Sequence, residues 1–486
     1  MKKKNLIHLL FKSGLFIILM GFLTMTCAFM FGTQNSGDLT WSAFYKQKKN
    51  SIDLLFFGNS HLGNGLDLNI VNAKTKSKVY TLYSSGQTLP QTYYNIKEAL
   101  KYQTPKLIVI ETFAISSDTI YYFNEPVSDK NIPLKAKLQS FDSKKLSLVK
   151  IEEYRDLYKG EEIIPTIFPL IRNHSNWADL DLLKGNLAKK MKPNSEYYFG
   201  CSNSIWPLSE SKIEEYRAKD FGKQEFKISK YQRSYFNKII ELAKDNNIEV
   251  LLVTIPYFKE YRKKIDYKSV HNSMIDLALK NNIKYLDLNH IFPDLSYQYF
   301  TNEPVGHNQH LSYKGGIVVS NYLSKYINNN YKFKTDNANK SLPEYYLYNK
   351  IKRETLNNGD KIIGNLDAIN GTKNTKYAST QGKGPIVLDG WIAIEGKSSK
   401  FNELFIALVR DNNFIYVSKP NQLKSKNRKD VTKYFNENNN LYDDSGFLIN
   451  IDSKLLELGR YSLYMVLRNN KGEVLIKDTF KTVEIL

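Results

Sequence analysis

The stretch LLFFGNSHLGNG, residues 54–65, ends an apolar run abruptly and places a serine beside a histidine directly after it. An apolar run bounded by turn residues is typical of a buried strand, and this run predicts one over 52–57. In open parallel sheets, ligands bind beyond the carboxyl ends of the strands. Ser60 lies three residues past Phe57, so the sequence predicts a serine at that edge of a sheet.

Four more apolar runs bounded by turn residues follow along the chain, and they predict strands at 79–83, 106–112, 250–255 and 284–288. Helical patterns lie between them. One, at 89–102, has a proline in its first turn, and another, at 227–247, gathers its apolar residues on one stripe. Alternation of strands and helices predicts an α/β domain whose parallel sheet is covered on both faces.

The N-terminus carries lysines and then a long uncharged stretch, residues 13–31. At about 1.5 Å per helical residue, this stretch spans the ~30 Å core of a bilayer. No convincing cleavage motif follows it, which favours an uncleaved anchor over residues 1–32 rather than a signal peptide. Positive residues stay in the cytoplasm, so we expect a single-pass protein of the cell membrane with the bulk of the chain, from about residue 33, outside.

The formal net charge is +20, and removing the four lysines of residues 1–31, where no acid occurs, leaves +16 on the exported part. So basic a surface favours an anionic partner, although the lysines could equally serve solubility alone. Export points to anionic lipid headgroups or cell-wall polymers and argues against nucleic acid. Outside the anchor the only cysteine is Cys201, so no disulfide is expected within the exported domain.

Composition divides the exported part into an α/β domain at 50–330, a linker at 331–375 and a β-rich domain at 376–486. The α/β domain contains a long polar insertion, 125–225, between its third strand and the helix before its fourth. The linker is rich in Asn, Lys and Thr. After it, short strands separated by turn signals predict a small β-sandwich.

A serine hydroxyl is a poor nucleophile at neutral pH and needs a base within hydrogen-bond reach. His310 is the natural candidate, because it directly precedes the helix that closes the alternating region. Taken alone, each residue has a plainer interpretation: Ser60 as a turn residue, and His310 as a capping or core residue.

The blocks FFGNSH, YSSGQT and HLSYKGG together resemble the SGNH (GDSL-like) hydrolase superfamily over roughly residues 50–330. The similarity is greatest to its membrane-tethered, extracytoplasmic branch, which includes the D-alanyl-lipoteichoic acid transfer protein and polysaccharide O-acetyltransferases. The resemblance implies a three-layer, flavodoxin-like α/β fold with strand order 2-1-3-4-5. It also implies that Ser60 is the nucleophile, His310 the base and Gly86 a backbone oxyanion donor.

The sequence departs from that family pattern at two positions. No asparagine follows the third strand, where Glu111 stands; either the Asn59 amide or a backbone N–H then serves the oxyanion, or the oxyanion hole is weaker. Three roles are open for Glu111: it binds substrate, it orients a base, or it is only an acidic residue at the end of a strand. Three residues before His310, where the family has an aspartate, this chain has His307. The imidazole is then oriented by a backbone carbonyl, Glu111 or Glu303, or the site is degenerate.

These features predict a serine acyl-transfer enzyme that modifies a cell-surface polysaccharide or teichoic-acid-like polymer by O-acetyl or D-alanyl transfer. The resemblance implies a membrane-bound acyl donor or a multipass membrane acyltransferase as partner. Two alternatives remain at this level: a carbohydrate esterase, and a catalytically inactive scaffold that binds the polymer. No cofactor and no metal site are expected, because the seven histidines show no ligand spacing.

Overall fold

The structure is a computed structural model. The residues that it describes are 3–32, 36–120, 134–191, 208–220, 223, 225–301, 310–333, 335–380, 384–400, 402–411, 414–418, 422–435 and 440–486.

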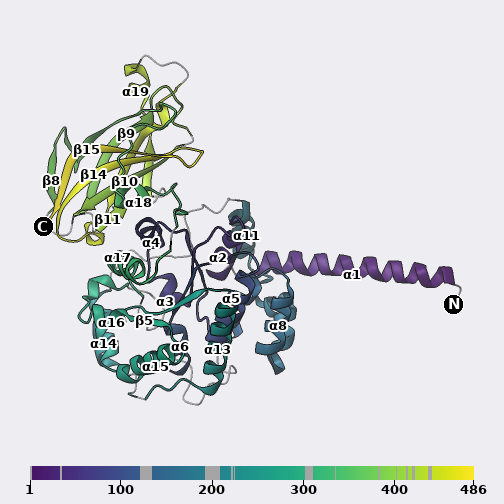
Figure 1. The fold of residues 1–486 in the computed structure, drawn as a ribbon. Helices are drawn as coiled ribbons and strands as arrows, with labels where there is room; N and C mark the ends of the chain where they lie inside the picture. Colours follow the sequence, from purple (N-terminus) through teal and green to yellow (C-terminus); the bar gives the residue numbers. More distant parts are fainter. Residues whose placement is uncertain are drawn as a thin grey trace.

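A five-stranded, all-parallel sheet forms the centre of the first domain (Figure 1). Its strands in spatial order are β2 (Val79–Tyr83), β1 (Leu54–Gly58), β3 (Leu107–Glu111), β4 (Glu249–Thr254) and β5 (Lys284–Asp287). This is the predicted order 2-1-3-4-5, and each strand lies within one or two residues of its predicted bounds.

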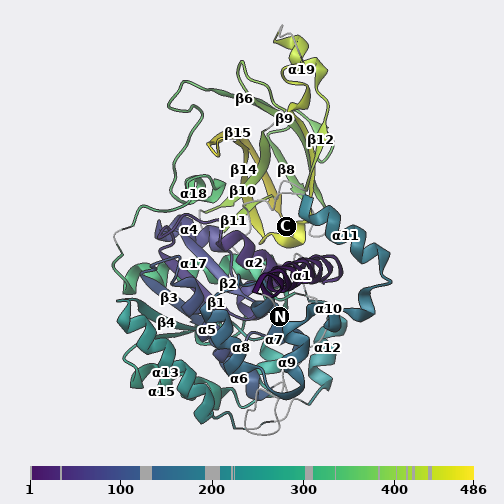
Figure 2. The ribbon, with the colours of Figure 1, turned by 90° about the vertical axis from the view of Figure 1, so that its right-hand side faces the viewer.

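Helices cover both faces of this sheet, as the two views together show (Figure 2). On one face α4 (Leu68–Thr75) packs on α17 (Tyr313–Asn330), and on the other α5 (Leu89–Ala99) packs on α13 (Lys230–Asp245). Capping boxes at the first residues of α5 and α13 satisfy backbone N–H groups that have no partner within the helix. The remaining helices of the domain are α15 (Tyr267–Lys280) and the shorter α3 (Ser60–Gly63), α6 (Phe113–Ile120), α14 (Lys259–Arg262) and α16 (Leu288–Ile291).

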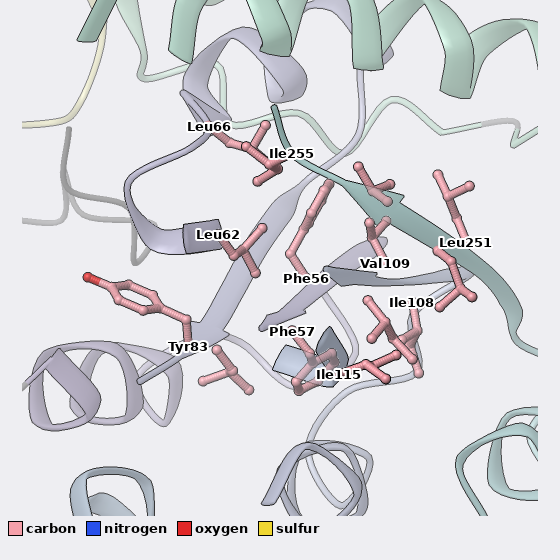
Figure 3. Close-up of a cluster of buried hydrophobic side chains, with 14 of the residues drawn as sticks. Phe56, Phe57, Leu62, Leu66, Tyr83, Ile108, Val109, Ile115, Leu251 and Ile255 are labelled. Carbon is pink, nitrogen blue, oxygen red and sulfur yellow. The ribbon is translucent and has the colours of Figure 1, made fainter. Parts of the chain in front are cut away.

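The core of this domain lies between the sheet and its helices (Figure 3). Phe56 and Phe57 of β1 lie on opposite faces of the central strand and are both fully buried. The register pairs Phe57 with Leu82 on one side and with Ile110 on the other. A strand buried on both faces explains why the deciding stretch is uniformly apolar rather than alternating.

The insertion is largely helical where the structure describes it. Its helices are α7 (Leu134–Ser143), α8 (Leu148–Leu157), α9 (Ile163–Ile167), α10 (Pro169–Arg172), α11 (Leu180–Met191) and α12 (Glu210–Ala218), with single turns at Gly160–Glu162 and His174–Asn176. A further turn, Tyr297–Tyr299, lies after β5. Helices α10 and α11 contact the N-terminal helix, so part of the insertion lies beside the predicted anchor.

The chain begins with one long helix, α1 (Lys3–Phe31), followed by α2 (Ser36–Phe44). Residues 7–27 of α1 are long and apolar enough to cross a membrane, and they are not buried against the rest of the protein. Among the described residues this is the one helix of that kind. Figure 1 shows it projecting away from the folded domains.

Two five-stranded sheets form the C-terminal domain. One contains β11 (Phe414–Val417), β10 (Glu403–Arg410), β14 (Gly459–Arg468), β15 (Val474–Ile485) and β8 (Tyr377–Thr380). The other contains β12 (Leu423–Lys426), β13 (Gly446–Ile451), β9 (Ile386–Ile394), β6 (Ile362–Ile369) and β7 (Thr372–Lys373). Neighbouring strands are antiparallel except for the parallel pair β15 and β8. A helix α19 (Lys429–Tyr434) and the turns Asp443–Ser445 and Ser453–Leu455 connect them.

Much of the predicted linker, 331–375, is instead folded. It contains helix α18 (Pro343–Tyr348), which packs on α4, and the hairpin of β6 and β7. The polar residues that suggested a linker are turn residues here. Asn370 and Gly371 both have positive φ, 50° and 79°, as a tight hairpin turn requires. The sandwich therefore begins with β6 at Ile362, fourteen residues before its predicted start at 376.

The two domains share one apolar cluster. Ile317 of α17 and Ile70 of α4 belong to the cluster that fills the sandwich, and the Tyr313 ring meets the Tyr416 ring edge-on at 5.7 Å. The Lys314 ammonium group donates to the carbonyl of Leu456 at 3.3 Å. The sandwich thus packs directly on α17, the helix that begins three residues after His310.

Candidate functional site

Ser60 begins helix α3 at the carboxyl end of the central strand. The preceding residue, Asn59, is the N-cap, and its side-chain oxygen accepts from the His61 backbone N–H at 3.0 Å. This sharp turn from strand to helix leaves Ser60 only partly buried. Ser60 Oγ lies 3.0 Å from His310 Nε2, within hydrogen-bond reach, although 250 residues separate the two in sequence.

Backbone pairing holds His310 in this place. The Thr301 N–H donates to the His310 carbonyl at 2.9 Å, and Phe300 forms an isolated β-bridge with Leu311. The His310 side chain is 5% exposed. His307, predicted as a supporting residue, lies outside the described residues, as does Glu303.

Asn64 connects the two residues of this pair. Its side-chain nitrogen donates to the Ser60 carbonyl at 2.9 Å and lies 3.3 Å from His310 Nδ1. The group on Nδ1 decides which tautomer the ring adopts, and only a ring with a free lone pair at Nε2 can take a proton from a serine. The Asn64 nitrogen can only donate, so this contact favours the ring with its hydrogen on Nε2, and His310 acts as base only when its hydrogen is on Nδ1. Asn64 is therefore placed to influence the tautomer of the base, a role that the sequence alone did not suggest.

A second imidazole lies next to the first. His61 is fully buried, and its Nδ1 lies 3.3 Å from Glu111 Oε1, which also accepts from the Phe113 backbone N–H at 2.8 Å. The rings of His61 and His310 have centroids 6.3 Å apart. Among the described residues, His61 Nε2 and Glu111 Oε2 are buried and have no hydrogen-bond partner. Of the predicted roles for Glu111, the geometry fits orienting a histidine, and that histidine is His61.

Aromatic residues enclose the His61 ring. Phe113 stacks on it with centroids 4.5 Å apart, and Tyr257 meets it edge-on at 5.5 Å. Burial, reinforced by the nearby Glu111 charge, holds the pKa of Tyr257 well above its ordinary value. The Tyr257 hydroxyl therefore keeps its proton and pairs with the Ser116 hydroxyl at 2.9 Å.

Gly86 lies in the turn after β2, and its φ of 69° is a backbone conformation that suits glycine. Because Gly58 pairs with Tyr83, the turns that follow β1 and β2 leave the sheet side by side. Gly58 has a different requirement. A Cβ there would lie 2.9 Å from the Glu111 Cβ and 3.0 Å from that of Leu62, so this strand end needs a glycine for close packing.

The structure thus brings Ser60 and His310 into contact and sets Asn59, Glu111 and Gly86 at neighbouring strand ends. Asn59 is used as a helix cap, which occupies its side-chain oxygen. Sequence reasoning missed His61 and Asn64. For Asn64 a signal was present in the sequence SHLGN, since one helical turn places the residue four after a serine back beside it, whereas no local signal marked the pairing of His61 with Glu111.

One group among the described residues could hold a metal ion: His271, Asp287 and His290. Asp287, at the end of β5, already accepts from His271 Nδ1 at 2.6 Å, from the Tyr267 hydroxyl at 2.7 Å and from the Asn289 backbone N–H at 2.9 Å. Burial, together with the Asp287 charge, raises the pKa of Tyr267 far above its ordinary value and keeps it a donor. These hydrogen bonds account for the cluster without a metal.

Comparison with known proteins gives a family but no activity. The family model described as "Protein of unknown function (DUF1574)" matches residues 38–300. No curated protein matches the chain significantly. Among solved structures, the endo-β-1,4-mannanase from Thermotoga petrophila is matched over 91% of this chain and 99% of that chain, at 7% identity. Its TM-score of 0.15 is too low to support any conclusion about fold or function.

Proposed function

Because the chain belongs to the DUF1574 family, whose function is unknown, we propose its function from the site: a membrane-anchored serine acyl-transfer enzyme that acts outside the cytoplasm. The observation that carries the proposal is the 3.0 Å contact between Ser60 Oγ and His310 Nε2 at the carboxyl edge of a parallel sheet. Covalent catalysis by serine requires at least a nucleophile and a base within hydrogen-bond reach of it. The SGNH-like blocks of the sequence support the same assignment.

The reaction proceeds in two steps. Ser60 Oγ attacks the acyl carbonyl carbon while His310 Nε2 takes its proton, and the oxygen leaving group of the donor departs with that proton. A hydroxyl of the acceptor then attacks the acyl carbon, and its proton passes to His310. The bond from Oγ to the acyl carbon breaks, and the proton returns to Oγ. In the first step His310 acts as base and then acid, and in the second step it repeats both roles.

The acceptor is a hydroxyl of a cell-surface polysaccharide or teichoic-acid-like polymer, modified by an acetyl or D-alanyl group. The net charge of +16 beyond the N-terminal helix supports an anionic polymer, because it raises the local concentration of such an acceptor. Helix α1 would hold the site near a membrane-bound acyl donor or a multipass acyltransferase. An esterase would use water in place of the acceptor hydroxyl.

A fluorophosphonate probe tests the nucleophile. The full chain in detergent should become labelled on Ser60, and Ser60→Ala should abolish labelling. His310→Gln should slow labelling at least about 100-fold, since general-base catalysis contributes roughly 10²–10⁴. Ser234→Ala, an exposed serine on α13, is the matched control and should label normally. A folded chain that never becomes labelled would support the inactive scaffold instead.

Mass spectrometry of surface polymer tests the acceptor. A strain that produces Ser60→Ala should lose one acyl substituent from a wall or membrane-linked polymer while keeping normal amounts of the protein. Gain of that substituent in the variant would identify an esterase. An unchanged polymer would contradict both enzymatic functions.

A further inference from the structure

The insertion carries an apolar face that points outward. Four of its residues are Ile164 and Ile167 of α9, Ile171 of α10, and Phe168, the non-helical residue that joins the two short helices. Here their side chains are about half exposed, as are two aromatic or aliphatic residues farther along. The six are Ile164 at 57%, Ile167 at 50%, Phe168 at 46%, Ile171 at 53%, Trp177 at 52% and Leu180 at 63%. We call this group the outward apolar face.

Polar contacts hold the same segment to the domain on its other side. Arg172 pairs with Asp142 of α7, and Lys137 of α7 pairs with Glu162 at 2.9 Å. Thr166, between the outward isoleucines, is buried. The segment is thus inverted relative to an ordinary surface helix, with ion pairs toward the protein and apolar side chains toward the outside.

The outward apolar face lies beside the C-terminal end of α1. Asn176 donates to the carbonyl of Phe31 at 2.9 Å, and Asn186 donates to those of Met30 and Gly32 at 3.0 and 2.8 Å. Figure 2, which looks along α1, shows α10 and α11 next to it. If residues 7–27 cross the bilayer, these hydrogen bonds hold the face at the level where the helix leaves the bilayer.

We propose that the outward apolar face inserts into the outer leaflet of the membrane that α1 crosses. An exposed apolar surface built from short helices, with an exposed tryptophan, is typical of segments that lie in the membrane interface. Its continuity with the apolar part of α1 favours lipid over a second protein. Exposed charges of both signs border the segment, Lys159 and Lys184 with Glu161, Asp179 and Asp181, so the proposal rests on the apolar face rather than on attraction to anionic headgroups. The inference rests on the proposed anchoring by α1, and it adds a second, non-covalent attachment that fixes how the domain faces the bilayer.

Spin labels in the full chain test this proposal. In a Cys27→Ala, Cys201→Ala background, a nitroxide is attached at Ile167→Cys, and the chain is reconstituted in nanodiscs of mixed phosphatidylglycerol and phosphatidylcholine. Ile171→Cys repeats the measurement should the first variant fold poorly. Leu279→Cys, a 75% exposed leucine on α15, is the matched control, and Ile17→Cys reports on the anchor. Oxygen concentrates in lipid and a nickel chelate in water, so power saturation gives the ratio of the two accessibilities.

The expected result is an oxygen-to-nickel ratio several-fold higher at Ile167 and Ile171 than at Leu279 and below that at Ile17, which lies in the middle of the span and so deeper in the bilayer. A high oxygen-to-nickel ratio at Ile17, together with ratios at Ile167 and Ile171 as low as that at Leu279, overturns the proposal and leaves the anchor intact. A ratio as low as that of Leu279 at every position overturns the anchor and the proposal together. A face shielded from both reagents means that a second copy covers it, which also overturns the proposal.

Discussion

At the scale of single residues, the predicted contact of Ser60 with His310 came from two sources: the alternation of strands and helices, which puts Ser60 at the carboxyl edge of the sheet, and the resemblance to the SGNH superfamily. The sequence was not enough to predict the neighbours of this pair. The contact of Asn64 with the His310 ring depends on how tightly one helical turn closes. The pairing of His61 with Glu111 depends on burial, which no local pattern encodes.

The position of Asn64 gives a prediction about the base. Asn64→Leu removes the group beside His310 Nδ1 and the donor to the Ser60 carbonyl. Loss of the hydrogen bond to the Ser60 carbonyl should slow labelling of Ser60 by a fluorophosphonate by roughly 10- to 100-fold, since small misplacements of catalytic groups have effects of this size. Asn64→Asp should label faster than Asn64→Leu, because a carboxylate accepts from Nδ1–H and so favours the tautomer with a free Nε2 lone pair, whereas the amide nitrogen of Asn64 can only donate to Nδ1. Equal rates in the wild type and Asn64→Leu would show that Asn64 does not position Ser60.

Gly58 gives a prediction about packing beneath the site. Gly58→Ala places a Cβ 2.9 Å from the Glu111 Cβ, closer than such atoms approach in proteins. Overpacking of this kind typically costs about 1–3 kcal/mol of unfolding free energy, and the displaced strand end should also slow labelling of Ser60. Gly384→Ala, where no atom lies within 4 Å of the added Cβ, should change neither quantity. Thermal denaturation and labelling rates of both variants are the measurements, and equal behaviour would contradict the prediction.

At the scale of elements, apolar runs predicted the strands of the sheet well, whereas polar composition gave a wrong prediction of a linker. Residues 331–375 have the composition of a linker, yet α18 is buried by tertiary contacts and β6 pairs with β9. A polar edge hairpin and a short docked helix are stabilised by their partners rather than by their own sequence. Composition could not reveal those partners.

Docking of α18 on α4 predicts a dependence of stability on pH. Burial first, and then the nearby Asp67 charge, raise the pKa of Glu344 from 4.5 to about 7. Below pH 4.5 the carboxyl is protonated in both the folded and the unfolded state. Between pH 4.5 and about 7 the carboxyl ionises in the unfolded state but stays protonated in the folded state, so each rise in pH there stabilises the unfolded state relative to the folded one. The folded state should therefore lose stability on the order of 3 kcal/mol between pH 4.5 and 8.

Glu344→Gln should abolish most of this loss, because the amide stays neutral and can still accept from Asn69. We expect a higher melting temperature than that of the wild type at pH 8 and a similar one at pH 5. Glu354→Gln, an exposed position, is the matched control and should follow the wild type. Parallel pH profiles for the wild type and Glu344→Gln would show that Glu344 does not titrate in this range.

At the scale of the whole molecule, the sequence predicted two exported domains but not that they share a core. Ile317 of α17 lies in the cluster that fills the sandwich, so Ile317→Ala should destabilise both domains, by about 2–5 kcal/mol. Calorimetry of the full chain should show one transition that moves as a whole. Leu279→Ala, at an exposed position, should change the unfolding free energy by less than about 0.5 kcal/mol. Two separate transitions, of which only one moves, would contradict a shared core.

The shared core also sets an order of events during synthesis. Ile70 and Ile317 remain uncovered until the strands of the sandwich, in the last third of the chain, have been made. At about 5–20 residues per second, a ribosome needs roughly 10–30 s to add residues 334–486. Throughout that interval the nascent α/β domain exposes an apolar surface to chaperones and proteases. A premature stop before the sandwich should therefore yield a chain that is degraded rather than a smaller stable protein.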